Sequence, residues 1–232
     1  MEKIKQAQCP ENFQADQYKL EIQNWTDNTI ICGIDEVGRG CLFGPFVACC
    51  AVLKPFSSHP LLKDSKILTE NQRLKAVAWI KENSWYAFGI IDHRTIDDIN
   101  ILQATKLAMK KAYYGVVTQL GKHADTVAID AVHLQFTPQQ TIHSLTKGES
   151  KSVSIAAASL LAKVYRDEMV KRLDAQFPGY GLKNNKGYGA KIHTEKIKDD
   201  GESLLHRTSF LSSLKKDKGK NNETNQQKSL FC

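Results

Sequence analysis

The 232-residue sequence lacks both a long apolar run and a Cys-x-x-Cys pair. A membrane span needs roughly 20 consecutive apolar residues, so no transmembrane segment is expected. Residues 1–6 also lack the apolar core of a secretory signal. We therefore expect a cytoplasmic protein rather than a membrane or secreted one.

The six cysteines do not form a pattern typical of zinc sites or disulfide scaffolds. Cys32, Cys49 and Cys50 lie in apolar runs, where a thiol behaves as a small hydrophobic side chain. Structural zinc sites commonly use closely spaced cysteine pairs, which this sequence does not have. All six thiols are therefore expected to be reduced, as is usual in the cytoplasm.

Acidic residues are fewer than basic ones, and the net charge of +7 with a pI near 9.0 permits a polyanionic partner. Part of this excess comes from the C-terminal tail. Residues 215–228 contain no apolar side chain, and such a composition predicts disorder. The charge alone does not identify the partner, because lysine-rich surfaces are often only solubilising.

Apolar strand-like runs alternate with amphipathic segments, which predicts an α/β domain with a central sheet covered on both sides. Strands are expected at residues 29–35, 46–53, 85–91, 126–130 and 140–145, and helices at 12–25, 69–83, 95–100, 101–120 and 154–177. Five side chains of the 101–120 helix are spaced for one buried face, namely Leu102, Ala104, Leu107, Ala108 and Ala112. Ligands of such sheets usually bind at strand ends, where Asp35, Glu36 and Asp130 fall.

The most informative segment is Gly33–Gly40, which reads Gly-Ile-Asp-Glu-Val-Gly-Arg-Gly after an apolar run. Side chains alternate faces along a strand, so the strand is expected to end or bulge at Asp35 and Glu36. Carboxylates beside an apolar core need a cation, and Mg²⁺ and Mn²⁺ prefer oxygen ligands. The Gly38-Arg39-Gly40 turn offers backbone N–H groups and a cation, which suit a phosphate. The alternative is an Asp-Glu pair in an ordinary surface turn.

Several further blocks follow in order: Asp64-Ser65-Lys66, Ile129-Asp130, Lys147–Ser150, Ser154–Ser159, Ala162–Asp167, Phe177–Gly181, Lys186-Gly187-Tyr188 and His206–Phe210. Together with residues 33–40 they resemble type 2 ribonuclease H, in particular bacterial ribonuclease HII, over residues 30–213. A series of blocks at compatible spacing is far more specific than any one of them.

This resemblance implies a ribonuclease H-like mixed sheet flanked by helices, with a small helical C-terminal appendage. The expected divisions are an N-terminal helical extension at 1–28, a catalytic domain at 29–177, the appendage at 178–214 and a disordered tail at 215–232. The implied activity is cleavage of the RNA strand of RNA–DNA hybrids and nicking 5′ to ribonucleotides embedded in duplex DNA, which leaves 5′-phosphate and 3′-hydroxyl ends.

The resemblance assigns the catalytic, metal-binding acids to Asp35, Glu36, Asp130 and Glu149, which would hold two Mn²⁺ or Mg²⁺ ions. The family usually has aspartate where Glu149 stands, so metal preference is expected to change. Glutamate at this place is also a feature of ribonuclease HIII, but only about 29 residues precede the first strand, too few for the N-terminal domain of that type. Another alternative is a hybrid-binding protein whose site Glu149 has weakened.

The substrate-binding residues implied by the resemblance are Gly38, Arg39, Gly40, Ser65, Lys66 and Tyr188. The Gly-Arg-Gly turn and Tyr188 would read the RNA-to-DNA junction, since backbone groups can approach a 2′-hydroxyl there. Asp64 could serve only as a turn cap. The pair His206-Arg207 could hold the C-terminal segment in place rather than contact substrate.

The final residues Gln227–Phe231 resemble the short peptide that bacterial replication proteins present to the sliding clamp. A glutamine followed by leucine and phenylalanine on a polar tether can fill an apolar pocket. The expected partners are thus RNA–DNA hybrids, ribonucleotide-containing duplexes and this clamp. The protein is expected to be a monomer.

Overall fold

The computed structural model describes residues 17–212 and 214. The chain forms two compact units. Of the described residues, unit 1 contains 17–37, 47–90 and 105–165, and unit 2 contains 38–46, 91–104 and those from 166 onwards. The division into domains at residues 29, 178 and 215 remains a prediction. In the described part of the chain, no helix is long and apolar enough to cross a membrane.

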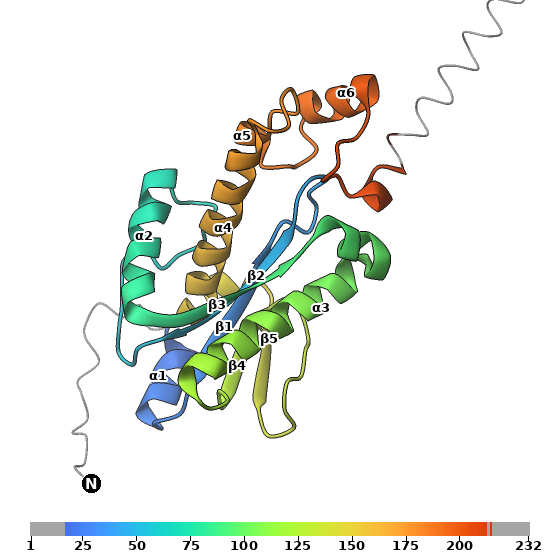
Figure 1. The fold of residues 1–232 in the computed structure, drawn as a ribbon. Helices are drawn as coiled ribbons and strands as arrows, with labels where there is room; N and C mark the ends of the chain where they lie inside the picture. The colour runs from blue at the N-terminus through green and yellow to red at the C-terminus, as the bar shows by residue number, and fades with distance from the viewer. Residues whose placement is uncertain (1–16, 213, 215–232) are drawn as a thin grey trace, which may run out of the picture. The chain divides into compact units, whose positions relative to one another are not determined.

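The sheet of unit 1 is mixed and five-stranded, in the order β3-β2-β1-β4-β5 (Figure 1). Its strands are β1 (Ile31–Val37), β2 (Phe46–Leu53), β3 (Ser84–Ile91), β4 (Thr126–Asp130) and β5 (Thr141–Leu145). Strand β1 runs antiparallel to β2 and parallel to β4, and β4 runs parallel to β5. The predicted α/β class and mixed sheet are confirmed.

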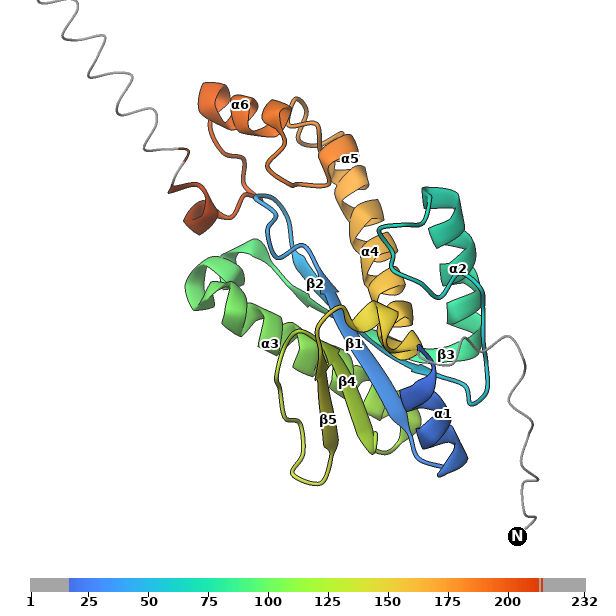
Figure 2. The same cartoon turned by 180° about the vertical axis from the view of Figure 1, so that it is seen from behind.

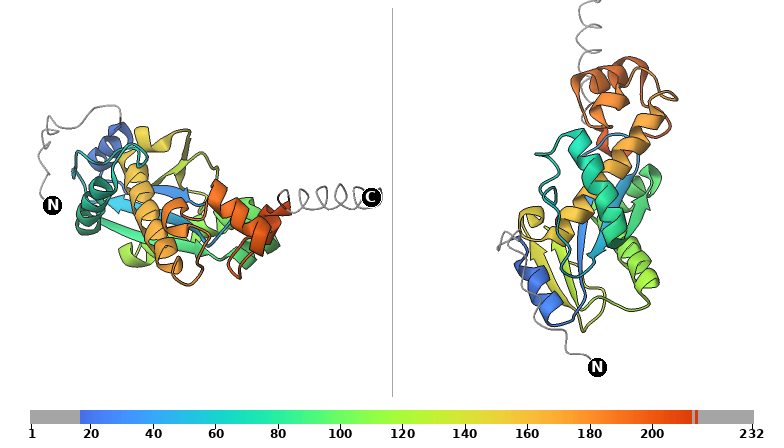
Figure 3. Two further views of the ribbon diagram at one scale, coloured as in Figure 1. Left: turned by 90° about the horizontal axis from the view of Figure 1, so that it is seen from above. Right: turned by 90° about the vertical axis from the view of Figure 1, so that its left-hand side faces the viewer.

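The helices are α1 (Lys19–Thr26), α2 (Glu70–Asn83), α3 (His93–Leu120), α4 (Val153–Leu173), α5 (Leu182–Asn185) and α6 (Lys191–Asp200), with short 3-10 turns η1 (Gly148–Ser150) and η2 (Thr208–Phe210). In unit 1, α1, α2 and the start of α4 pack on one face of the sheet, and α3 packs on the other (Figure 2). The right-hand view of Figure 3 shows this layering along the sheet. The predicted helix at 12–25 is described only from its second half, because residues 12–16 lie outside the described residues.

Local sequence signals account for several helix boundaries. Thr69 caps α2 through a capping box, in which its hydroxyl accepts from Gln72 N and the Gln72 side chain accepts from Thr69 N. Asn100 interrupts α3 with φ 64° and caps the second half by accepting from Leu102 N and Gln103 N. The two predicted helices on either side of residue 100 are therefore confirmed.

Two details of the helix predictions were wrong. Leu102 and Leu107 are 47% and 37% exposed, whereas the three alanines of the same set are fully buried. The buried face of α3 also includes Met109, Tyr113 and Val116, and α3 lies so close to β3 that a Cβ on Gly89 would lie 1.9 Å from the Ala108 carbonyl oxygen. Helix α4 ends at Leu173 rather than residue 177, because Phe177 turns into an apolar cluster of unit 2 and packs against Phe43.

The expected end or bulge at the acid pair is also absent from the described strand. Strand β1 pairs with β2 in unbroken register through Val37, with Asp35 opposite Cys49 and Glu36 opposite Ala48. The regular pairing continues because Val37 still packs against the core beneath α4. Four cysteines lie in the described part of the chain, and all four are buried free thiols, as expected for Cys32, Cys49 and Cys50 from their apolar surroundings in the sequence.

Candidate active site

Parallel pairing brings two of the predicted acids to one edge of the sheet. Ile34 of β1 pairs with Ile129 of β4, and the next residues along the two strands are Asp35 and Asp130. Because both strands run in the same direction, their carboxyl ends share that edge. The Asp130 charge contributes to raising the pKa of Asp35, as expected for neighbouring acids.

Glu149 reaches the same edge from the turn η1. Gly148 N donates to Asp130 Oδ1 at 2.7 Å, so the turn is bonded directly to the strand-end acid. A Cβ on Gly148 would lie 3.1 Å from Asp130 Oδ1 and 2.7 Å from Ile155 Cδ1, which explains glycine at this place. The Glu149 Oε1 atom in turn lies 3.1 Å from Lys66 Nζ.

Burial and mutual repulsion make this cluster electrostatically unfavourable without a cation. Asp35 is only 6% exposed, and burial, followed by the neighbouring Glu36 charge, raises its pKa well above the ordinary value. Burial raises the pKa of Asp130, and Glu149 adds to this effect. These raised pKa values mean that ionising all of these carboxyl groups is unfavourable in the absence of a cation.

In residues 17–212 and 214, no group of three or more His, Cys, Asp or Glu side chains is arranged to hold a metal ion as it stands. The residues nevertheless fit a hard divalent cation on two grounds. Their donors are carboxylate oxygens, the ligands that Mg²⁺ and Mn²⁺ prefer. One cation, the Lys66 ammonium group, already contacts this cluster at Glu149.

The Asp64-Ser65-Lys66 element lies beside the acids. Asp64 Oδ1 accepts from Lys66 N at 2.9 Å, which is the turn-capping role considered for it. Ser65 is 5% exposed, and its hydroxyl lies 3.3 Å from the Ser159 hydroxyl of α4. The Ser159 hydroxyl also hydrogen-bonds the Asp35 side chain and thereby opposes the rise in its pKa. Sequence reasoning placed Ser159 in a matching block but did not assign it this contact.

In unit 2, a buried arginine organises the Gly38-Arg39-Gly40 turn. Arg207 Nη1 donates to the Gly38 and Arg39 carbonyls at 2.7 and 3.1 Å, and Arg207 Nε donates to the Gly44 carbonyl. In a trans peptide the N–H points opposite to the carbonyl, and the described chain contains no cis peptide. The N–H groups of Arg39 and Gly40 therefore point away from the guanidinium group.

The two glycines of the Gly38-Arg39-Gly40 turn differ in whether the fold would accept a larger residue. Gly38 has φ 92°, and a Cβ there would lie 2.3 Å from Nε of the fully buried Arg166. Arg166 itself donates to the Phe43, Pro45 and Lys186 carbonyls. A Cβ on Gly40 would meet no atom within 4 Å in the described structure. The fold thus requires glycine at 38, whereas Gly40 leaves open space for a ligand.

Tyr188 lies next to Arg166, and its carbonyl is hydrogen-bonded to one of two paired histidines. Its ring centroid is 5.9 Å from Arg166 Cζ, its side chain is 39% exposed, and burial raises its pKa to about 12. The Tyr188 carbonyl accepts from His193 Nδ1 at 2.7 Å, and His193 Nε2 lies 2.9 Å from His206 Nε2. Ser203 N donates to His206 Nδ1 at 2.9 Å. These donors place one proton on His193 Nδ1 and one on His206 Nε2, so both rings are neutral.

Comparison with known proteins agrees with these motifs. The family model described as Ribonuclease HII matches residues 32–213. The chain is 42% identical over 209 residues to a ribonuclease HII of Staphylococcus epidermidis, covering 89% of this chain and 79% of the relative. It is 44% identical over 194 residues to that of Staphylococcus carnosus, covering 83% and 72%.

Solved structures share the fold at lower identity. The structure of Bst-RNase HIII in complex with Mn²⁺ aligns with a TM-score of 0.67 at 22% identity, over 81% of this chain and 68% of that one. The structure of the PCNA:RNase HII complex from Archaeoglobus fulgidus aligns with a TM-score of 0.62 at 22% identity, over 79% and 96%. At this level of identity the structures support the architecture alone.

Proposed function

The chain belongs to the ribonuclease HII family of ribonuclease H endonucleases, hydrolases that act on RNA–DNA hybrids, and we propose that it also nicks duplex DNA 5′ to single embedded ribonucleotides. Both reactions would leave 5′-phosphate and 3′-hydroxyl ends. The observation that carries this proposal is the acidic cluster at the ends of β1 and β4, where burial and mutual repulsion raise the pKa of Asp35 and Asp130.

In the proposed reaction, two divalent ions would be held by the carboxylates of Asp35, Glu36, Asp130 and Glu149. When bound, these ions would lower the pKa of the attacking water and stabilise the leaving 3′ oxygen. The Mn²⁺ in the Bst-RNase HIII structure supports manganese or magnesium as the metal. Lys66, whose side chain is 78% exposed, would contact a phosphate, with Ser65 behind it.

We further propose that unit 2 reads the sugar. The N–H groups of Arg39 and Gly40 would donate to the 2′-hydroxyl, because the Arg207 guanidinium group holds the opposite carbonyls. Tyr188 would pack on the following deoxyribose and exclude a second 2′-hydroxyl. The contact of the turn with one 2′-hydroxyl and the exclusion of a second one by Tyr188 would together distinguish an RNA-to-DNA junction from continuous RNA.

The deciding experiment uses a duplex with one ribonucleotide, incubated with purified protein and Mn²⁺ or Mg²⁺. A single nick on the 5′ side of the ribonucleotide supports the proposal, and Asp35→Asn serves as the inactive control. Binding without a nick would instead favour a hybrid-binding protein whose site is weakened by Glu149. An all-ribonucleotide strand without a junction tests the role of Tyr188: Tyr188→Ala should reduce the preference for the junction more than Tyr188→Phe does.

We also propose that Gln227–Phe231, which lies outside the described residues, binds the bacterial sliding clamp. The archaeal ribonuclease HII solved with PCNA shows that a protein of the same fold forms a clamp complex. Deleting residues 226–232 should abolish clamp binding and leave nicking of short duplexes unchanged. Retained clamp binding in the deletion variant would contradict this assignment. A cytoplasmic monomer is the form that we propose for the working enzyme.

A further inference from the structure

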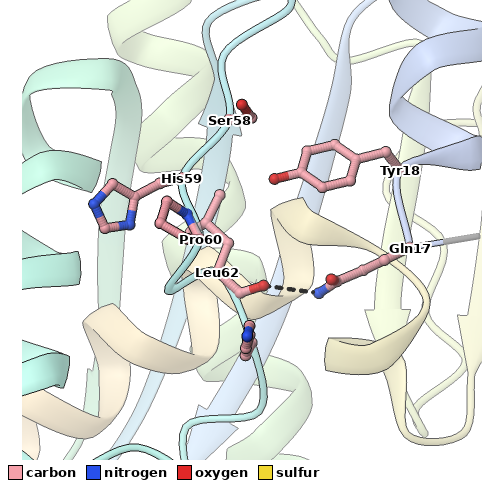
Figure 4. A pocket seen from close by; sticks show the side chains of 7 residues that line it. Gln17, Tyr18, Ser58, His59, Pro60 and Leu62 are labelled. Atoms are coloured by element: carbon pink, nitrogen blue, oxygen red, sulfur yellow. Dashed lines mark hydrogen bonds between the residues drawn. The ribbon is translucent and has the colours of Figure 1, made fainter. Parts of the chain in front are cut away.

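Gln17, two residues before the start of α1, contacts the turn that carries Glu149. Gln17 Nε2 donates to the Glu149 carbonyl at 2.8 Å and to the Leu62 carbonyl at 3.0 Å. The second of these bonds joins two residues that line a pocket, whose lining is Gln17, Tyr18, Ser58, His59, Pro60, Leu62 and Lys63 (Figure 4). One side-chain amide therefore joins the Glu149 turn to the loop before α2.

Glu21 of α1 forms a second connection, at the beginning of α4. The Glu21 side chain is fully buried, and its Oε1 atom accepts from Ser152 Oγ at 2.5 Å and from Ser154 N at 3.0 Å. Ser152 Oγ also accepts from Ile155 N, so it caps the helix in the usual way. No cation pairs with Glu21 among the described residues. Burial raises the pKa of Glu21, and the hydrogen bonds from Ser152 and Ser154 at the positive end of the α4 dipole oppose this rise.

These two contacts hold both ends of the short segment from residue 149 to residue 154. Among the bonds of the described residues, one hydrogen bond joins the backbone of this turn directly to the acidic cluster. It runs from Gly148 N to Asp130 Oδ1. Lys147, immediately before the turn, has φ 56° and ψ 50°, a strained conformation for a residue other than glycine. A turn that begins in a strained conformation needs such external contacts to keep one geometry.

We infer that Gln17 and Glu21 are positioning residues that fix the backbone of Glu149 so that its carboxylate can complete the metal site. This inference rests on the proposed role of Glu149 as a metal ligand. Glutamate has one more rotatable bond than aspartate, so its carboxylate can reach more positions, and a fixed backbone limits that range. Residues that orient metal ligands commonly change metal affinity when they are replaced.

The first test measures Mn²⁺ binding directly, by calorimetric titration of the purified protein. The Mn²⁺ concentration that gives half-maximal nicking is measured in parallel. Gln17→Ala should weaken Mn²⁺ binding about three- to tenfold, with kcat recovered at saturating metal. Glu21→Gln keeps an oxygen acceptor for Ser152 and Ser154 and should weaken binding less than Glu21→Ala does. Thermal melts of each variant identify any loss of folding.

Gln23→Ala is the matched control. Gln23 lies on α1, as Glu21 does, and its side chain is exposed. Among the bonds of the described residues it donates only to Asp27 Oδ2, at 3.2 Å. This substitution should leave both Mn²⁺ affinity and nicking unchanged. An effect of Gln23→Ala equal to that of Gln17→Ala would overturn the inference, since it would then reflect α1 stability in general.

A double-variant comparison separates this inference from the proposed function. If Gln17 acts through Glu149, Gln17→Ala should weaken Mn²⁺ binding in the native background and have no further effect in the Glu149→Ala background. The same loss in both backgrounds, or no loss in the native one, overturns the inference while the metal site stands. Mn²⁺ binding by Glu149→Ala that equals the native affinity would overturn the assignment of Glu149 itself.

Discussion

Lys66 Nζ lies 3.1 Å from Glu149 Oε1, although the Lys66 side chain is 78% exposed and that of Glu149 only 7%. The hydrogen bond to Glu149 is the largest cause that raises the pKa of Lys66. Lys66 thus supplies a positive charge at Glu149, the acid that replaces the usual aspartate of the family. The same ammonium group would compete with a divalent ion for the Glu149 carboxylate and would be released to a phosphate once that ion binds.

Lys66→Ala should therefore separate metal binding from substrate binding. An exposed ion pair contributes about 0.2–1 kcal/mol, so Mn²⁺ should bind up to about fivefold more tightly to the variant in a calorimetric titration. KM for the hybrid should rise because a phosphate contact is lost. Lys63→Ala, at a neighbouring exposed lysine, is the control for the general loss of charge. Weaker Mn²⁺ binding by Lys66→Ala would contradict this account.

Asp35→Asn should stabilise the metal-free protein while abolishing cleavage. The pKa of Asp35 is raised in the folded state, so the ionised carboxylate destabilises the fold at any pH above its unfolded pKa. Asparagine retains the Oδ1 acceptor for Glu36 N and removes the charge. We expect a gain on the order of 1 kcal/mol in the free energy of unfolding at neutral pH, measured by denaturant unfolding in EDTA. The gain should shrink as the pH falls and Asp35 takes up its proton; a gain independent of pH would argue against repulsion as its cause.

The two glycines of the Gly38-Arg39-Gly40 turn should respond differently to alanine. Gly38→Ala introduces strain at φ 92° and a contact of 2.3 Å with Arg166 Nε, so it should lower the free energy of unfolding by about 1–3 kcal/mol. Gly40→Ala has open space around its Cβ and should leave the thermal melt unchanged. Its kcat/KM on a single-ribonucleotide duplex should nevertheless fall at least about tenfold, because the methyl group would meet the sugar. Full activity of Gly40→Ala would show that the substrate does not approach this residue.

The neutral histidine pair should make unit 2 sensitive to acid. Burial, followed by the neighbouring His193, lowers the pKa of His206 from 6.5 to about 4, and burial also lowers the pKa of His193. A lowered histidine pKa contributes stability that is present above pH 6.5 and is lost as the pH falls towards 4. For His206 this loss is at most about 3 kcal/mol. Thermal melts between pH 7 and 4 should show it, and His206→Gln should flatten the profile.

Nitrogen NMR of the imidazole rings gives an independent measurement of the same arrangement. His193 should carry its proton on Nδ1, since it donates to the Tyr188 carbonyl, and His206 should carry its proton on Nε2, since its Nδ1 accepts from Ser203 N. The opposite tautomer on either ring at neutral pH would contradict the hydrogen-bond chain that leads to Tyr188.

The sequence was sufficient for features whose causes are local. An apolar run followed by a carboxylate predicted strand β1 and the end of β4 at Asp130, and Thr69 with Gln72 predicted the start of α2. It was not sufficient for the face of α3 that is buried. Leucine spacing predicted that Leu102 and Leu107 are buried, but α3 instead buries the face that carries Ala108, Met109 and Tyr113.

The sequence by itself determined the strands that carry Asp35 and Asp130 and the family to which the chain belongs, because residue type and short-range spacing encode these directly. Only the tertiary structure decided which groups hold the site residues in place. Gln17 and Glu149 are 132 positions apart, and Arg207 and Gly38 are 169 apart. Such bonds form because buried polar groups must find partners, and which partners are within reach depends on how distant segments pack, not on any local pattern.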